Sequence, residues 1–451
     1  MKKQPNIVLY FSDQQRADTI GCYNDAIDFT PNLDTLAAEG LQYAYAFTAQ
    51  PVCGPCRAIF QTGRYPTETG CFRNNIALPP GTRTLAQRMY AAGYDAAYVG
   101  KWHLASTGPL EGAPEIDYQR RAIPPEYRGG YTGYWRASDL LEFTSDSRGG
   151  YLFDEHMQRH DFVGYRCNCI TDYALEYLDQ TPTDQPFFLT ISHIEPHHQN
   201  NHGHYEGPEG SKDRFKNYPI PDDLTAFEGD YREEYPDYLG CCASLDENLG
   251  RIIAKLREKS IYDNTVVIYV SDHGSHFKTR NRDKHLCGYD DYKRSCHDAC
   301  LRVPLIIGGG AIRKKKLVKD LVSTISLPKT ILRLAGSSEA DELCGEDLIA
   351  VANSDLPKKE NHIFAQISES RVGRVLRTER YKLAVVAAGM PGGEYAAVDR
   401  YVGDFLYDLA ADPCETRNLI DDTNYADIRA ALYKILKDEI YAAERVCPVL
   451  E

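Results

Sequence analysis

The 451-residue chain lacks any apolar run near the length of a membrane span, and it contains neither an internal repeat nor a low-complexity tract. It also lacks an excess of positive charge, because 65 acidic residues against 51 lysines and arginines give a formal net charge of −14. This charge argues against partners held by bulk electrostatics, so we expect neither nucleic acid nor a membrane as a partner. An anionic ligand would need local cations or a metal to attract it.

The N-terminus lacks the features of a secretory signal peptide. Two lysines precede an apolar run at residues 7–11, but the run is short, follows a proline, and leads to no small-residue cleavage site. The 14 cysteines are scattered over a long chain, whereas disulfide frameworks are typical of short secreted ones. We therefore expect a cytoplasmic protein with mostly reduced thiols.

Short apolar runs alternate with helical patterns over the first three quarters of the chain. This alternation predicts an α/β domain over residues 1–354, with buried parallel strands flanked by helices. Residues 104–165 and 194–238 are rich in Gly, Pro, Tyr and charge, which predicts long loops over one edge of the sheet. The predicted strands are 6–11, 94–99, 186–191, 265–270 and 304–307, and the predicted helices are 33–39, 84–92, 170–178 and 243–259.

The pattern changes after about residue 355. Short strand-like pieces occur at 382–386 and 404–407, and a helical pattern closes the chain at 426–443. Residues 355–451 are therefore predicted to form a smaller C-terminal α+β subdomain.

Polar residues follow four of the predicted strands. In open α/β sheets, ligands bind beyond the carboxyl ends of the strands, so these residues are expected to meet at one edge. They are Asp13 and Gln14, Lys101 and His103, His197, and Asp272 and His273.

Two of these pairs suggest a metal site. The carboxylates of Asp13 and Asp272, the amide of Gln14 and the imidazole of His273 form a mostly oxygen set, which suits Ca²⁺, Mg²⁺ or Mn²⁺. The alternative is that each pair caps a helix or loop at a strand end.

The stretch PVCGPCRAIFQTGR brings Cys53 and Cys56 within three residues of each other. A zinc site needs a second Cys/His pair, and the cysteines at 167/169 and 241/242 are poor candidates. A redox pair before a helix is the second reading, although no small thioredoxin-like βαβ unit surrounds it. A helix predicted at 56–62 would lower the pKa of a cysteine at its start.

Cys53-Gly54-Pro55-Cys56-Arg57, followed by Thr62-Gly63-Arg64, resembles the signature of the type I, formylglycine-dependent sulfatases. The resemblance extends over nearly the whole chain and implies the alkaline phosphatase-like fold, with a large, mixed, mostly parallel sheet and a short antiparallel C-terminal sheet plus helix. The further matching motifs are Asn6-Ile7-Val8, Thr30-Pro31-Asn32-Leu33-Asp34, Gly100-Lys101-Trp102-His103-Leu104, Pro196-His197, Ser271-Asp272-His273-Gly274, Arg302-Val303-Pro304-Leu305 and Leu406-Tyr407-Asp408-Leu409.

The resemblance implies that a sulfatase-maturating enzyme oxidises Cys53 to formylglycine. It also implies one divalent metal ion, with Ca²⁺ first and Mn²⁺ or Mg²⁺ as alternatives, held by Asp13, Gln14, residue 53, Asp272 and His273. The sequence departs from the family at two positions: Cys56 stands where a small residue is usual, and Gln14 where many relatives carry aspartate.

The resemblance also implies catalytic roles. Arg57 and Lys101 would hold the hydrated aldehyde of residue 53 in its reactive state, and Lys293 would stabilise charge in the transition state. His197 would protonate the departing alcohol, and His103 would deprotonate the second hydroxyl so that sulfate is expelled.

The substrate predicted from the polar segments 195–201 and 276–282, with Trp135 and Arg136, is a small sulfated sugar. The alternative is that these are exposed loop residues. The candidate substrate-binding residues are His198, Gln199, Asn200, Arg280 and Arg282.

Three other functions stay open at this point. A phosphonate or phosphate monoester hydrolase would use the same site. A non-catalytic anion-binding protein would keep Cys53 as a thiol, and a redox protein would cycle a Cys53–Cys56 disulfide. The sequence also leaves a homo-oligomer open.

Overall fold

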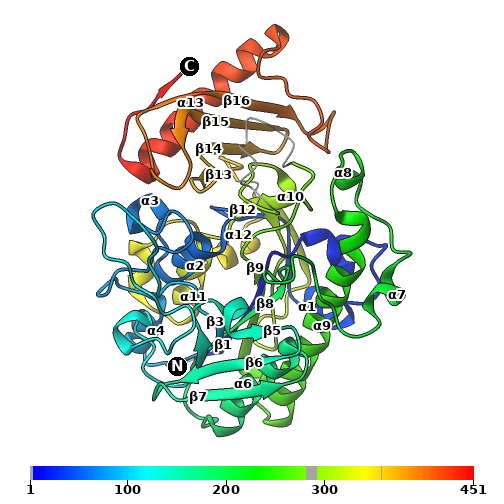
Figure 1. Cartoon of the computed structure of the whole chain (residues 1–451), viewed down its shortest axis with the longest axis vertical. Helices are drawn as coiled ribbons and strands as arrows, with labels where there is room; N and C mark the ends of the chain where they lie inside the picture. Colours follow the sequence, from blue (N-terminus) through cyan, green and yellow to red (C-terminus); the bar gives the residue numbers. More distant parts are fainter. Residues whose placement is uncertain (1–3, 281–291, 357) are drawn as a thin grey trace.

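The computed structural model of the chain describes residues 4–280, 292–356 and 358–451. A large sheet with helices on both faces forms most of the molecule, and a smaller sheet with one long helix, drawn in orange and red, lies at one end (Figure 1). This is the α/β arrangement with a C-terminal α+β part that the sequence predicts. Within the described residues, no helix combines the length and apolar character needed to cross a membrane.

Within the described residues, the large sheet has 12 strands and is mixed. Its central strands run in the order β11-β9-β1-β8-β3-β4, and all of these neighbours are parallel except the β11–β9 pair. The strands are β1 (Asn6–Asp13), β2 (Leu41–Phe47), β3 (Asp95–Lys101), β4 (Trp135–Ser138), β5 (Ser145–Asp146), β6 (Gly149–Asp154), β7 (Arg159–Val163), β8 (Phe187–Pro196), β9 (Thr265–Ser271), β10 (Arg302–Val303), β11 (Leu305–Gly308) and β12 (Lys316–Ser323).

Both faces of the sheet are buried, as the continuous apolar runs predict. Alternate residues of β1 enter different cores: Ile7 and Leu9 pack on one face, whereas Val8 and Tyr10 pack on the other. The helices over the two faces and around the sheet's edges are α1 (Pro31–Glu39), α2 (Cys53–Thr62), α3 (Pro66–Thr69), α4 (Leu85–Ala91), α5 (Leu141–Thr144), α6 (Arg166–Gln180), α7 (Ser211–Phe215), α8 (Asp222–Thr225), α9 (Tyr231–Glu258), α10 (Asp298–Leu301), α11 (Ser326–Leu334) and α12 (Leu348–Asn353).

Three predicted features are wrong. The strand at 304–307 is β11, which runs antiparallel to β9 rather than parallel. Residues 104–165 are not one long loop, because β4–β7 and α5 extend the sheet there. β4 is buried but only four residues long, and β6 and β7 are partly exposed, with Val163 94% exposed, so none of them has the apolar run that marks a buried strand.

Residues 194–238 likewise contain regular structure. β8 continues to Pro196, α7 and α8 follow, and α9 starts at Tyr231 instead of residue 243. The first turns of α9 bury Tyr231, Tyr235 and Tyr238 at helical spacing, although Pro236 interrupts the sequence pattern.

The second sheet consists of the antiparallel strands β13 (His362–Ile367), β14 (Arg371–Thr378), β15 (Tyr381–Pro391) and β16 (Arg400–Asp408), with β17 (Val449–Leu450) parallel to β16. The two strands and the helix predicted for this region correspond to β15, β16 and α13 (Ala426–Glu444). Phe47 of β2 and Leu321 of β12 share a core with Ile363 and Phe405, which joins the two sheets. The division of the chain between residues 354 and 355 stays a prediction.

Candidate active site

Four neighbouring strands end beside one another and carry the polar residues to one place. β1 ends at Asp13, β3 ends at Lys101, β8 is followed by His197, and β9 is followed by Asp272. Gln14 has a φ of 71°, so the chain turns sharply as it leaves β1. The meeting at the carboxyl ends of the strands that the sequence predicts is therefore present in the fold.

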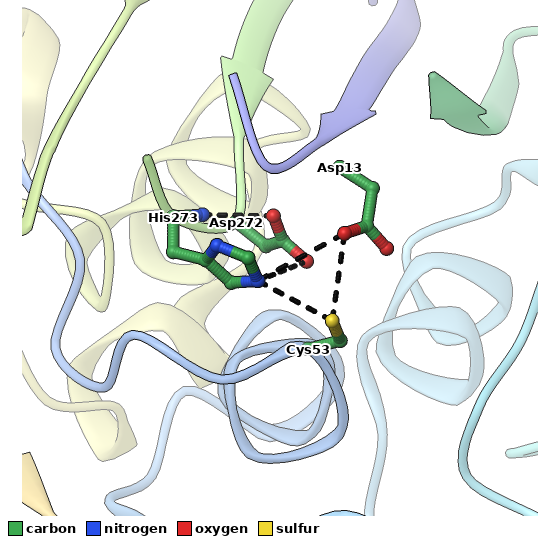
Figure 2. A group of neighbouring side chains, drawn as sticks. All are labelled: Asp13, Cys53, Asp272 and His273. Atoms are coloured by element: carbon green, nitrogen blue, oxygen red, sulfur yellow. Dashed lines mark hydrogen bonds and ion pairs between the residues drawn. The ribbon is translucent and has the colours of Figure 1, made fainter. Parts of the chain in front are cut away.

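Asp13, Cys53, Asp272 and His273 form a buried group (Figure 2). One ligand atom from each lies within 4.8 Å of those of the others. Cys53 Sγ lies 3.4 Å from Asp13 Oδ1 and 3.3 Å from His273 Nε2. The first residue of α2 thus lies between ligands from β1 and from the segment after β9.

The donor atoms of this group fit a divalent cation. Asp272 Oδ2 and Gln14 Oε1 are buried without a hydrogen-bond partner in the described part of the chain. His273 Nδ1 donates to the Gly274 carbonyl at 2.9 Å, which leaves the lone pair of Nε2 on the side of the group. Buried oxygens that lack a partner are costly, and a hard cation coordinated by carboxylate, amide and imidazole would remove that cost.

Two cations hold the Asp13 carboxylate in position. Arg57 Nη2 and Lys101 Nζ both donate to Oδ2 at 2.9 Å, while Oδ1 is the oxygen that contacts Cys53. Burial alone would raise the pKa of Asp13, but the positive charges of Lys101 and Arg57 outweigh it and hold that pKa well below its usual value. The carboxylate is therefore ionised and oriented.

Lys293 contacts both Cys53 and His197. Its Nζ lies 2.8 Å from Cys53 Sγ and 2.8 Å from His197 Nε2. His197 Nδ1 lies 2.7 Å from the His198 carbonyl, which can only accept, so Nδ1 carries the proton and Nε2 faces the lysine. Burial, reinforced by Lys293, lowers the pKa of His197 well below its usual value.

Neither cysteine has the lowered pKa predicted for a thiol at the start of this helix, which begins at Cys53 instead of Cys56; burial raises the pKa of Cys56 as well. Burial and the neighbouring Asp13 raise the pKa of the Cys53 thiol to about 12, against the opposing effect of Lys293 and Lys101. That prediction is wrong because loss of solvation in the closed site exceeds the effect of the helix dipole.

His103 follows β3 in the left-handed region, with a φ of 59°. It is 7% exposed, and its Nδ1 has no hydrogen-bond partner among the described residues. Burial and Lys101 lower the pKa of His103 well below its usual value, so the imidazole is neutral and able to accept a proton.

Cys56 points away from this chemistry. Its Sγ donates to the Asp272 carbonyl at 3.2 Å and accepts from the Thr48 hydroxyl at 3.4 Å. Both Cys53 and Cys56 are free thiols. Cys56 therefore packs against the backbone of the segment after β9 and forms no redox pair with Cys53 in this structure.

The candidate substrate residues on the segment after β8 lie in different surroundings. The His198 ring stacks on His197 at 4.5 Å, next to the site. Gln199 is buried and accepts from Arg166 Nη1 at 3.0 Å, so its side chain stabilises the loop. Asn200 is exposed in a turn.

The candidates on the segment after His273 are directed elsewhere or cannot be placed. Arg280 donates to the carbonyls of Cys414 and Glu415 at 2.8 and 3.0 Å, which ties this segment to the C-terminal part. Arg282 lies outside the described residues. Trp135 is fully buried in an aromatic cluster and forms part of the core.

Three residues of the site are absent from the sequence-based prediction. Glu142 of α5 lies 3.2 Å from Lys101 Nζ. The Tyr205 hydroxyl accepts from Gln14 Nε2 at 2.6 Å, and the Asn74 side chain accepts from the Gly54 amide at 2.9 Å. No local pattern marks them, because each reaches the site through tertiary contacts only.

Two family models match the chain. The sulfatase model matches residues 5–337, and the model described as N-sulphoglucosamine sulphohydrolase, C-terminal, matches residues 287–442. Together they extend over both sheets of the fold.

Similar proteins cover nearly the whole chain. The uncharacterized sulfatase YidJ of Escherichia coli K12 is 30% identical over 466 residues, covering 97% of this chain and 87% of the relative. The solved structure of a sulfatase yidJ from Bacteroides fragilis has a TM-score of 0.80 at 23% identity and covers 98% of this chain and 97% of its own. A structure in complex with its substrate D-glucosamine-2-N,6-O-disulfate has a TM-score of 0.75 at 20% identity, and 98% of each chain is covered. The chain belongs to the sulfatase family of sulfuric ester hydrolases, within the alkaline phosphatase-like superfamily.

Proposed function

We propose that this sulfatase hydrolyses a sulfate ester of a small carbohydrate, with residue 53 acting as formylglycine and with one divalent metal ion, Ca²⁺ first and Mn²⁺ or Mg²⁺ as alternatives. The observation that carries the proposal is the position of the residue 53 side chain, between the Asp13–Asp272–His273 group and the Lys293 ammonium. A nucleophile for sulfate needs this combination of anchored ligands and positive charge.

Asp13, Gln14, Asp272 and His273 are the residues that would hold the metal. When bound, the metal would neutralise sulfate oxygens and make an oxygen nucleophile at residue 53 more acidic. Arg57 and Lys101 contribute by fixing Asp13, since both bind Oδ2 and leave Oδ1 beside residue 53. Lys293 places a positive charge where negative charge grows in the transition state.

The proton for the departing alcohol would come from the His197–Lys293 pair. His197 Nδ1 is occupied by the His198 carbonyl, so only Nε2 can exchange a proton with the site. The 2.8 Å contact between Nε2 and Lys293 Nζ holds that proton between two basic atoms. A neutral His103 would accept the proton released when sulfate leaves residue 53.

Two observations support a carbohydrate as the alcohol. The similar structure solved with D-glucosamine-2-N,6-O-disulfate has a sulfated sugar as its substrate. In this chain, the buried His198 ring stacks on the proposed acid His197, and Asn200 follows two residues after His198 in an exposed turn. A sugar offers hydroxyl groups that such side chains can bind.

Parallel kinetics test this function. The mature enzyme is assayed with sulfated monosaccharides, an aryl sulfate and a phosphonate monoester of matched leaving group, and the mass of the peptide with residues 53–57 is measured in the same preparation. We expect a formylglycine mass and the highest kcat/KM on a sugar sulfate. A higher kcat/KM on the phosphonate would favour the monoester hydrolase, and an unmodified thiol in active enzyme would contradict the formylglycine.

A further inference from the structure

A second group of ligand-type side chains lies in the core between α6 and β8. Cys167 belongs to the first turn of α6, and His193 and Glu195 lie near the end of β8. One ligand atom from each lies within 4.8 Å of the others, and all three side chains are buried. None of them takes part in the proposed hydrolysis.

The side chain of His193 gives the strongest indication that this group binds a ligand. It is 0% exposed, and neither Nδ1 nor Nε2 has a hydrogen-bond partner among the described residues. Leaving a buried polar group unpaired is costly, and here both nitrogens of one ring are in that state. Burial and Arg166 lower the pKa of His193 to about 3, so the ring is neutral and offers a lone pair.

Glu195 is only half satisfied. Arg166 Nε donates to Oε1 at 2.9 Å, while Oε2 is buried and has no partner in the described part of the chain. Cys167 Sγ accepts from Asn248 Nδ2 at 3.5 Å, a contact that would stabilise a thiolate. Cys167 and Glu195 therefore each have a neighbour that orients the side chain, as is usual around metal ions.

We propose that Cys167, His193 and Glu195 hold a second divalent metal ion of the zinc type. Thiolate, imidazole and carboxylate are the ligands that zinc takes in proteins, and a soft thiolate disfavours Ca²⁺ and Mg²⁺. Binding replaces the Cys167 thiol proton, which is released to solvent, and places two anionic ligands on the dication. The three protein ligands leave one position of a tetrahedral zinc for a water molecule.

This ion would act on the structure rather than on the sulfate ester. It would clamp the first turn of α6 to the end of β8, and β8 leads directly through Pro196 to His197. The proposal of a zinc site does not depend on the proposed hydrolysis, because none of its three residues takes part in that reaction. The zinc content of the protein therefore tests the proposal independently of enzyme activity.

The first experiment measures zinc in the full-length chain. Wild type, Cys53→Ala, Cys167→Ser and Glu195→Gln are produced in zinc-supplemented medium, dialysed, and analysed by elemental mass spectrometry, with circular dichroism as a check on folding. We expect about one zinc per chain in wild type and Cys53→Ala, and about a tenfold lower content in the other two variants. Wild type without zinc, or equal zinc in all four chains, would overturn the proposal.

Cobalt substitution tests the ligand itself. Because Cys53 is a second thiol near a metal-binding group, the Cys53→Ala variant is the background, and it is loaded with Co²⁺ with and without Cys167→Ser. A thiolate–cobalt charge-transfer band in the near ultraviolet is expected for Cys53→Ala and lost in the double variant. A band that persists in the double variant would exclude Cys167 as the ligand, and so would the absence of a band from Cys53→Ala loaded with the metal.

Discussion

The Nζ atom of Lys293 lies 2.8 Å from Cys53 Sγ and 2.8 Å from His197 Nε2. One ammonium group therefore connects the proposed nucleophile position with the proposed acid. Cys53 and Lys293 are 240 residues apart in the chain, so this contact exists only in the folded site. It explains why we assign Lys293 both charge stabilisation and a part in proton transfer.

Replacing this lysine should impair the chemical step. Lys293→Ala removes the ammonium that contacts both Cys53 and His197, and we expect kcat/KM to fall by about 10²–10³-fold, as for the loss of an oxyanion donor. Lys437→Ala on the exposed side of α13 is the control and should leave kcat/KM unchanged. A loss smaller than threefold in Lys293→Ala (roughly 0.7 kcal/mol) would contradict the assigned role.

The two cysteines of the opening motif should respond differently to substitution. Cys53→Ala removes the formylglycine precursor and should abolish activity, whereas Cys56→Ala removes one thiol hydrogen bond to a carbonyl and should cost about 1 kcal/mol of stability. Activity assays and urea unfolding of both variants distinguish these effects. Equal loss of activity in the two variants would instead favour a role for both thiols.

Glu369 should position the start of α2 from the second sheet. Its Oε2 accepts from the Asn74 amide at 2.7 Å, its Oε1 accepts from Arg294 Nε at 2.8 Å, and Asn74 Oδ1 in turn accepts from the Gly54 amide. Glu369→Ala should lower kcat about tenfold with a smaller change in KM, because residue 53 loses its fixed position.

The controls for Glu369 separate positioning from general destabilisation. Glu369→Gln keeps an acceptor of the same size and should recover part of the lost kcat. Glu394→Ala, an exposed carboxylate, should behave as wild type. Unchanged kcat in Glu369→Ala would show that the start of α2 needs no support from the second sheet.

Calcium should stabilise the fold through Asp272. Asp13 and Asp272 are buried within one ligand group, and a bound cation would neutralise both carboxylates. Adding Ca²⁺ at about 100 times Kd to chelated protein should add about 2.7 kcal/mol, which raises the melting temperature by several degrees. Scanning fluorimetry of Asp272→Asn should show a much smaller shift, and an equal shift would place the calcium elsewhere.

The contacts of Asp298 with Lys382 and Arg377 should make the link between the two sheets less stable at low pH. Burial alone would raise the pKa of Asp298, but Lys382 and Arg377 outweigh it and lower that pKa. Because the folded pKa lies below the unfolded value of about 3.9, this stabilisation is present above that pH and is lost as the pH falls toward the folded pKa.

Urea unfolding of Asp298→Asn at two pH values checks this sign. The loss of unfolding free energy relative to wild type should be larger at neutral pH than at about pH 3, where the wild-type carboxylate begins to lose its advantage. Asp421→Asn, at an exposed position, is the control without such a difference. A deficit that grows as the pH falls would contradict the assigned direction.

The sequence by itself determined the α/β class, the C-terminal sheet and the residues that gather at the strand ends. These features are local, because an apolar run followed by Asp13, Lys101, His197 or Asp272 can be recognised within a short stretch of sequence. Parallel strands then bring such residues to one edge of the sheet. The family motif around Cys53 is local as well.

Only the tertiary structure decided what those side chains contact. In the fold, Arg280 donates to a carbonyl of the C-terminal part, and the Cys56 thiol donates to the Asp272 carbonyl. Burial in the closed site raises the pKa of the Cys53 thiol instead of lowering it. The fold also brings Cys167 next to His193 and Glu195. Burial and partners depend on chain segments far apart in sequence, and the solvation of a polar group is fixed only when those segments pack together.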